Sequence, residues 1–354
     1  MGGRSLIMMR IFGDTSVGKR GASQVFIGKS GEWLPIGTGA NGDVRCLVEW
    51  NGDLYVGGDF TSIGGVTTTG IARWSGGSWY AVGGGIGTGY VVDICVYNNE
   101  LYCLGTSSNL AGTGRNYFAK WNGTSWSGVG SSDLSDAAYA LYVWDSKLLI
   151  GGQFFTAGGV SAFCKAAWNG TTFSDYSNGN GMIPIGDFTD DGSTLYSAGG
   201  SYTSLVQEWS GSAWSSLGGD TGGAGGLYAA QAYGGDLYVG GAEQYIDDGV
   251  SNVYVGCLGK LSGGSWSSVG ALTSSVQELT VWNSNLIIGG TFTTSGFNRI
   301  AQYDGTTLSA IGAGFNNTVY NVGKYGKYLV AVGQFTASGS TSIDRIAYWS
   351  RPEP

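Results

Sequence analysis

Short runs of β-branched and aromatic residues, separated by turn-forming residues, recur along most of the chain. Between positions 43 and 83, the runs DVRCLVEW and DLYVGG flank Asn51-Gly52, a pair that readily adopts the positive φ angles of a two-residue hairpin turn. A second pair of runs, GIARWS and SWYAVG, flanks Gly76-Gly77. The pattern predicts four antiparallel strands, which we call A, B, C and D.

This four-stranded unit is repeated along the chain. Strand B of each copy ends in glycine, at intervals of roughly 40–50 residues that suit four-stranded propeller blades. These glycines are Gly57-Gly58, Gly105, Gly151-Gly152, Gly199-Gly200, Gly240-Gly241, Gly289-Gly290 and Gly333. Strands C and D carry paired landmarks at a constant spacing: Trp74 and Trp79, Trp121 and Trp126, Trp168 and Phe173, Trp209 and Trp214, Leu261 and Trp266, Tyr303 and Leu308. We therefore predict an all-β fold, a seven-bladed β-propeller of four-stranded antiparallel blades.

The two ends of the repeat array complete each other. The last copy ends at IAYWS (346–350), before any fourth strand, while Trp33 to Gly37 near the N-terminus matches strand D. We expect this N-terminal strand to join the C-terminal blade, because closure removes exposed sheet edges. VFIGK (25–29) competes with IAYWS for a third-strand position, so eight blades, with one divided differently, is the alternative.

Charge divides the chain into two regions. Residues 1–23 match no repeat and carry Arg4, Arg10, Lys19 and Arg20 against Asp14, a net charge of +3. The remainder has 13 basic and 24 acidic side chains, a net charge of −11 within the overall −8. We predict an irregular basic N-terminal arm (1–23) and an acidic propeller (24–354).

Repeated motifs indicate a family resemblance. The glycines that end strand B, followed by aromatic residues at fixed spacing, resemble the Kelch-type propellers of the galactose-oxidase superfamily. The variants GGDFTSIGG, GGTFTTSG, VGQFTASG and GGQFFTAGG are similar to repeats of large bacterial surface and secreted proteins. The resemblance spans about residues 24–350 and implies a fold without specifying a function, because propellers carry many unrelated activities.

The composition excludes several chemistries. The chain contains no histidine, so a Ser-His-Asp triad, a Cys-His pair and the histidine-ligated copper of galactose oxidase cannot be built. Carboxylates could still hydrolyse glycosides, and one acidic cluster comprises Asp187, Asp190 and Asp191. It aligns with the A–B turns of other copies, which indicates a solvated turn. We expect no enzyme activity, no metal and no cofactor.

The partners are constrained in the same way. The acidic body lacks the clustered Lys and Arg of a nucleic-acid binder. No apolar run is long enough for a membrane helix, and SLIMMRIF (5–12) lacks the features of a signal peptide. The five cysteines form no metal or disulfide motif, and buried free thiols are favoured. Cys95 and Cys103 would face each other only if their hairpin loop held three residues.

Candidate binding residues lie where the repeat is uneven. The segment between strands B and C is longest in the fifth copy, where Tyr245, Asp247 and Asp248 interrupt the pattern, and shortest in the fourth. Binding residues are often found on such loops. The aromatic series that ends strand A recurs in nearly every copy, which indicates packing between blades rather than a multivalent lectin. Its members are Trp50, Tyr97, Trp144, Tyr233, Trp282 and Tyr325.

We predict a non-enzymatic structural or recognition propeller in a virion or at the cell surface. In the preferred hypothesis it is a phage structural component that docks on other protein subunits through residues 1–23. The alternative is an extracellular carbohydrate-binding adhesin or lectin, or a carboxylate-dependent glycosidase or lyase. An intracellular Kelch-like adaptor is a third hypothesis.

Overall fold

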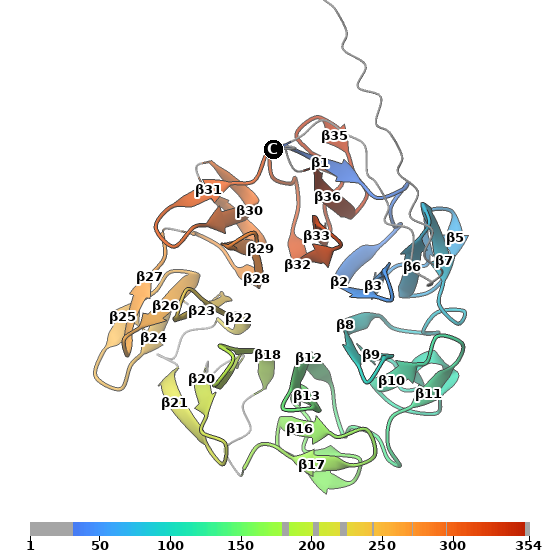
Figure 1. Ribbon diagram of the computed structural model, residues 1–354, viewed down its shortest axis with the longest axis horizontal. Coiled ribbons are helices and arrows are strands. Elements are labelled where there is room, and N and C mark those ends of the chain that lie inside the picture. The colour runs from blue at the N-terminus through green and yellow to red at the C-terminus, as the bar shows by residue number, and fades with distance from the viewer. Residues whose placement is uncertain are drawn as a thin grey trace, which may run out of the picture.

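The computed structural model describes residues 31–178, 184–200, 205–219, 225–242, 244–270, 272–294 and 296–350. Seven blades, each with four antiparallel strands, form a ring (Figure 1). This confirms the predicted seven-bladed β-propeller, and the eight-bladed alternative is wrong. The predicted arm, with Arg4, Arg10, Lys19 and Arg20, and the VFIGK segment lie outside the described residues.

The first six blades run from the innermost to the outermost strand in chain order. Blade one consists of β2 (Asp43–Trp50), β3 (Asp53–Asp59), β6 (Ile71–Ser75) and β7 (Ser78–Ala81). Blade two consists of β8 (Val91–Tyr97), β9 (Glu100–Gly105), β10 (Phe118–Trp121) and β11 (Trp126–Gly128). Blade three consists of β12 (Ala138–Trp144), β13 (Lys147–Gly152), β16 (Lys165–Trp168) and β17 (Phe173–Asp175). Blade four consists of β18 (Ile185–Asp190), β19 (Leu195–Gly199), β20 (Leu205–Trp209) and β21 (Trp214–Gly219). Blade five consists of β22 (Leu227–Tyr233), β23 (Asp236–Gly241), β26 (Leu258–Ser262) and β27 (Ser265–Ser268). Blade six consists of β28 (Val276–Trp282), β29 (Asn285–Thr294), β30 (Phe297–Tyr303) and β31 (Leu308–Ala310).

Blade seven joins the two ends of the repeat array, as predicted. β32 (Val319–Tyr325), β33 (Tyr328–Gly333) and β36 (Ile346–Ser350) come from the C-terminal side, and β1 (Glu32–Pro35) adds the outer strand. β1 lies beside β36 in this blade (Figure 1), and Trp33 lies opposite Trp349 in the pairing. Its side chain is only 1% exposed, so the closing strand is anchored in the core.

The hairpin turns follow the sequence pattern. Asn51 and Gly52 both have positive φ angles, 54° and 80°, as a two-residue primed turn requires. The hairpin of blade two turns at two residues in the same way, which places Cys95 opposite Tyr102 and Cys103 opposite Ile94. The two thiols therefore do not pair. All five cysteines are free, and all except the half-buried Cys95 are buried.

The glycines at the end of strand B allow the blades to approach closely. A Cβ atom on Gly57 would lie 2.4 Å from the Val91 side chain of the next blade, and one on Gly58 would lie 2.1 Å from the Asp43 carbonyl oxygen. Neither position can accept a larger residue without displacing a neighbouring strand. The recurrence of these glycines thus follows from contact between and within blades.

In five of the seven blades a strand D tryptophan links the blade to the one before it. The indole N–H groups of these tryptophans donate to the backbone carbonyl of the residue that ends the outer segment of the preceding blade. The five pairs are Trp33 with Ile311, Trp79 with Ile36, Trp126 with Val82, Trp214 with Tyr176 and Trp266 with Leu217, at 2.7–3.2 Å. These tryptophans belong to the scaffold, as predicted.

The two faces of the ring differ. Antiparallel order places the A–B and C–D turns on one face, which we call the turn face, and the B–C and D–A connections on the other, the loop face. Several B–C connections form small hairpins: β4 (Ser62–Ile63) with β5 (Val66–Thr67), β14 (Thr156–Ala157) with β15 (Val160–Ser161), β24 (Tyr245–Asp247) with β25 (Asn252–Tyr254), and β34 (Ala337–Ser338) with β35 (Thr341–Ser342). In blade two a short 3-10 turn, η1 (Leu110–Gly112), takes that place.

Candidate functional site

A cavity of about 750 Å³ occupies the centre of the ring, where the innermost strands of the blades converge. We call it the central channel. The bulge near the start of each innermost strand places one residue of each blade at an equivalent level of the channel wall. In blade order these residues are Cys46, Asp93, Ala140, Asp187, Ala229, Glu278 and Asn321.

The three acidic residues of this level come from alternate blades and each bridges to the next blade. Asp93 accepts a hydrogen bond from the backbone N–H of Leu141 at 2.8 Å, and Asp187 accepts one from Ala230 at 2.8 Å. Glu278 accepts from the Asn321 side-chain amide at 2.8 Å. The channel carboxylates therefore hold neighbouring blades together.

Burial changes the acidity of these groups. It raises the pKa of Asp93 to about 7, against the lowering effect of the backbone N–H groups of Leu141 and Ile94. Burial also raises the pKa of Asp187, and the charge of Asp93 adds to this effect. The pKa of Glu278 is raised by burial and then by the charges of Asp187 and Asp93.

The structure corrects the prediction for Asp187. It was expected in the A–B turn with Asp190 and Asp191, but it lies near the start of β18 and faces the channel. Only Asp191 occupies the turn, where its carboxylate accepts hydrogen bonds from the backbone N–H groups of Ser193 and Thr194. Burial raises the pKa of Asp191, but these and other hydrogen bonds outweigh burial and lower it to about 2.

The channel opens on the loop face through a mouth lined by tyrosines. The guanidinium group of Arg45 lies between the rings of Tyr90 and Tyr320, 4.5 Å and 4.9 Å from their centroids. Tyr139 and Tyr228, the second residues of the innermost strands of blades three and five, are 36% and 40% exposed. The mouth therefore offers aromatic surface beside one fixed cation.

Blade three presents further aromatic surface on the loop face. Phe155 and Phe163 flank the β14–β15 hairpin, are 48% and 37% exposed, and meet edge to face at 6.4 Å. The backbone N–H groups of Phe155 and Thr156 donate to the Ser135 hydroxyl at 2.9 Å and 3.0 Å. The D–A connection therefore fixes the position of this hairpin.

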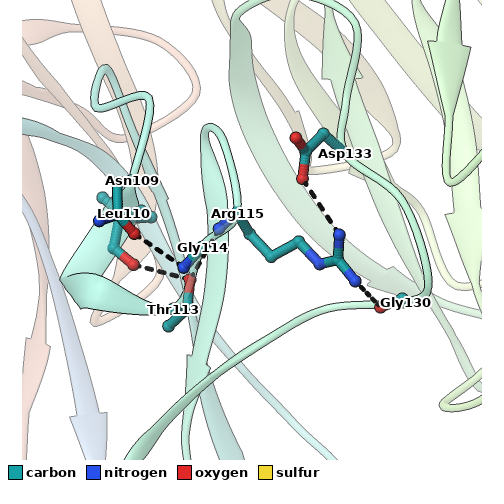
Figure 2. A network of polar contacts seen from close by, with 7 residues as sticks. All are labelled: Asn109, Leu110, Thr113, Gly114, Arg115, Gly130 and Asp133. Atoms are coloured by element: carbon teal, nitrogen blue, oxygen red, sulfur yellow. Dashed lines mark hydrogen bonds and ion pairs between the residues drawn. The ribbon is translucent and has the colours of Figure 1, made fainter.

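The B–C connection of blade two is held in a similar way. Figure 2 shows Asn109 accepting from the backbone N–H of Gly114 at 2.7 Å. The Arg115 guanidinium reaches the connection to blade three, 3.4 Å from the Gly130 carbonyl and 3.7 Å from Asp133 (Figure 2). These contacts indicate that the loop face is preformed in this part of the ring.

The predicted candidates of blade five lie on a hairpin with an additional structural role. β24 and β25 extend the sheet of blade four, with Asp247 opposite Gly219 of β21. Tyr245 and Tyr254 are 43% and 51% exposed and meet edge to face at 5.3 Å. Asp248 accepts hydrogen bonds from the two backbone N–H groups that follow Gly249. A binding role for Tyr245, Asp247 and Asp248 stays a prediction.

A buried polar pair between blades three and four was not predicted. Lys165 is 2% exposed, donates a hydrogen bond to the Gln207 side chain and lies 4.2 Å from the centroid of the Trp214 ring. Burial lowers the pKa of Lys165 to about 7. The positions equivalent to Lys165 in the other blades are apolar: Ile71, Phe118, Val206, Leu258, Ile300 and Ile346. Alignment of the copies by strand C would have revealed the exception.

Among the described residues, no group of three or more Cys, Asp or Glu side chains is close enough to hold a metal ion. In the same part of the chain, no helix is long and apolar enough to cross a membrane.

The fold is that of a seven-bladed β-propeller, and known structures share it. An extracellular domain of a putative hybrid two-component system from B. thetaiotaomicron is 12% identical, with a TM-score of 0.62 over 91% of this chain and 40% of that chain. The chain thus spans two fifths of that protein's length. A computationally designed protein, Ika8, is also 12% identical, with a TM-score of 0.55 over 89% of this chain and 98% of that one.

These similarities concern the fold alone. No family model matches the sequence, and no curated protein sequence matches it. The resemblance to Kelch-type repeats therefore stays a prediction from the motifs.

Proposed function

We propose that the protein is a non-enzymatic recognition module that docks a protein partner through the loop face of blades three to five. The supporting observation is where the exposed apolar side chains lie. The described residues include nine large exposed hydrophobic side chains, seven of them on this face: Tyr139, Phe155, Phe163, Tyr228, Tyr245, Val250 and Tyr254. Exposed apolar surface gathered on one face is typical of interaction sites.

Comparison of the blades strengthens this proposal. Phe155 occupies the position of Thr61 in blade one and Thr336 in blade seven, and its backbone carbonyl accepts the equivalent hydrogen bond. Phe163 likewise occupies the position of a threonine in blade one and an aspartate in blade seven. The fold tolerates polar residues at both places, so folding does not require the two phenylalanines. Binding of an apolar partner surface accounts for them.

The channel carboxylates favour a non-enzymatic function. A glycosidase needs two carboxyl groups free to act on one substrate. Asp93 and Asp187 instead accept two backbone hydrogen bonds each, one from their own blade and one from the next. Their arrangement supports a role in joining the blades.

An extracellular or virion setting is part of the proposal. The extracellular domain among the similar structures has the same fold, and propellers commonly act as rigid binding platforms. The assignment to a phage particle rests on the sequence of the basic arm. Deletion of residues 1–23 is the separate test of that part, because it should abolish assembly while the propeller stays folded.

The docking surface is tested with substitutions taken from the sister blades. The variant carrying Phe155→Thr and Phe163→Thr serves as bait, beside the wild type, for cross-linking to cell-surface and particle fractions of the producing organism. Tyr80→Ser is the matched control, because Tyr80 is 46% exposed on an outer strand. We expect a protein partner that is retained by the control and lost with the double variant. Equal capture by all three baits, or capture by none, would contradict the proposal.

A further inference from the structure

The seam between blades three and four contains a second cavity, on the turn face. Its volume is about 770 Å³, and Trp144, Tyr176 and Trp209 contribute aromatic rings to its wall. All three rings are half-buried. The cavity is separate from the loop face, so its function does not depend on the docking surface proposed above.

At the two preceding seams, between blades one and two and between blades two and three, the aromatic residue that ends strand A has partners on both sides. Trp50 packs against Tyr55 at 5.4 Å, and its indole N–H donates to Asn99 of the next blade at 3.3 Å. Tyr97 likewise packs against Tyr102 and donates to the Ser146 carbonyl oxygen at 2.8 Å. These residues are 5% exposed and have no surface to offer a ligand.

Trp144 is the equivalent residue of blade three and lacks both kinds of partner. The position of Tyr55 is occupied in this blade by Leu149, which offers no ring. Within the described part of the chain, the Trp144 indole N–H makes no hydrogen bond and its ring meets no other ring. Both the N–H donor and the ring are therefore available to a ligand.

The turn of blade four explains the missing hydrogen bond. In blades two and three the second turn residue, Asn99 or Ser146, has a positive φ angle of 58° or 57°. In blade four Asp191 replaces the aromatic residue at the end of strand A, and its carboxylate binds the N–H groups of Ser193 and Thr194. Within this turn only Gly192 has a positive φ angle. The described groups of this turn bind one another, and none of them accepts the Trp144 N–H.

Tyr176 adds a second aromatic surface at the same seam. It occupies a position that is Val82 in blade one and Val129 in blade two, where the side chain is 3% exposed. Its ring stacks on Trp209, with centroids 4.7 Å apart and an angle of 28° between the planes. The backbone carbonyl of Tyr176 still accepts the Trp214 N–H, as valine would allow. The scaffold therefore does not require the tyrosine ring.

The polar lining complements these rings. Glu208, Ser193, Thr194 and Ser210 line the cavity beside them. Among the described residues of the wall, Lys147 is the one cation and is paired with Asp145 at 2.7 Å, so Glu208 leaves this part of the site with a net negative charge. Aromatic faces pack against the apolar C–H face of a pyranose ring, and carboxylate and hydroxyl groups bind its hydroxyls. The acidic site and the acidic propeller disfavour uronic or sulfated sugars.

We propose that this cavity, the seam pocket, binds a neutral pyranose unit of a glycan. Its size suits a ligand of one or two sugar rings. Trp144 contributes a ring face and an N–H donor, Tyr176 and Trp209 contribute the stacked rings, and Glu208 accepts hydrogen bonds from sugar hydroxyls.

The test begins with a glycan array that contains neutral, uronic and sulfated glycans, probed with the full chain. The methyl glycosides of glucose, galactose, mannose and N-acetylglucosamine are then titrated by calorimetry and ligand-observed NMR. We expect binding of a neutral glycan that Tyr176→Val and Trp144→Ala each weaken at least tenfold. Tyr176→Val introduces the residue of blades one and two, so it should fold normally, and Glu208→Gln gives a further folded variant. Tyr80→Ser is the control and should bind as the wild type does.

Three results would overturn the proposal. These are no binding of any neutral glycan at millimolar concentration, binding of anionic glycans alone, and neutral binding unchanged in both Tyr176→Val and Trp144→Ala. Loss of neutral binding in the Phe155→Thr and Phe163→Thr variant, with Tyr176→Val unaffected, would place the sugar on the loop face and also count against the seam pocket.

Discussion

The seam between blades six and seven is tightly packed, whereas the seam between blades three and four is not. The opposite would be expected, because only blade seven is built from both ends of the repeat array. Blade seven is assembled from both ends of the repeat array, yet Trp33 is 1% exposed, donates to the Ile311 carbonyl at 3.0 Å and packs against Phe315 at 4.9 Å. The seam between blades three and four lies within continuous repeats, and it has an open cavity and a buried lysine.

The difference shows where sequence deviation is tolerated. In blade seven the outer strand β1 is joined to β36 by strand pairing alone, and its Trp33 keeps the strand D hydrogen bond to the preceding blade. The inner seam has continuous chain on both sides and has exchanged several repeated residues for others. The altered residues thus lie away from the β1–β36 pairing that closes the ring.

The largest expected effect is at the closing seam. Trp33→Ala should lower the free energy of unfolding by about 3–5 kcal/mol, because it removes a fully buried ring and a hydrogen bond between blades. Denaturant unfolding followed by circular dichroism measures this loss. A loss below about 1 kcal/mol would show that β1 contributes little to closure.

The buried pair of the inner seam should respond differently to one substitution and to two. Gln207→Ala alone should cost about 1–3 kcal/mol, because it leaves Lys165 buried without its acceptor. Adding Lys165→Met should restore most of that stability, since apolar replacement of both buried partners is often neutral. A double-mutant cycle measures the coupling. Additive losses would contradict the proposed dependence of Lys165 on Gln207.

The channel carboxylates predict a dependence of stability on pH. The folded-state pKa of Asp93 is raised from 3.8 to about 7, so the folded protein binds this proton more tightly than the unfolded chain does. The resulting stabilisation is complete below about pH 4 and is lost as the pH rises through about 7. Unfolding free energies measured from pH 5 to pH 8 should therefore fall, and Asp93→Asn should reduce the slope. An unchanged slope would assign the dependence to other groups.

The loop face should show the smallest effect on stability. Phe155→Thr with Phe163→Thr should change the unfolding free energy by no more than about 0.5 kcal/mol, because both side chains are substantially exposed. The melting temperature provides the measurement. A large decrease would mean that the two phenylalanines serve the fold, and would weaken the case for a docking surface.

The fold could be predicted because its determinants are repeated. Hairpin turns such as Asn51-Gly52 and the strand D tryptophans recur at a constant spacing, so each copy confirms the others. The role of Trp33 in closure followed from the missing last strand. Asp187 was assigned to a turn because blade four lacks the aromatic landmark at the end of strand A, which left the alignment of that segment uncertain.

The sites were harder to predict because they depend on the loss of a repeated contact. Trp144 belongs to the aromatic series by its position. Only the absence of a ring partner and of an indole hydrogen bond distinguishes it from Trp50 among the described residues. The hairpin that carries Tyr245 was recognised as an irregular loop, but its pairing with β21 of the neighbouring blade involves a contact between distant segments. Tyr176 stands where blades one and two have valine. A comparison of the copies that uses only the repeated glycines and aromatic residues does not include this position and so misses the substitution.

The most direct test of the contrast between regular and altered seams compares two equivalent tryptophans. Trp50 is 5% exposed with a ring partner and a hydrogen bond, whereas Trp144 is half-buried with neither. Trp50→Ala should therefore cost about 3–5 kcal/mol in unfolding free energy, and Trp144→Ala about 1 kcal/mol. Equal losses for the two substitutions would contradict the account, because they would show that Trp144 is as much a part of the scaffold as Trp50.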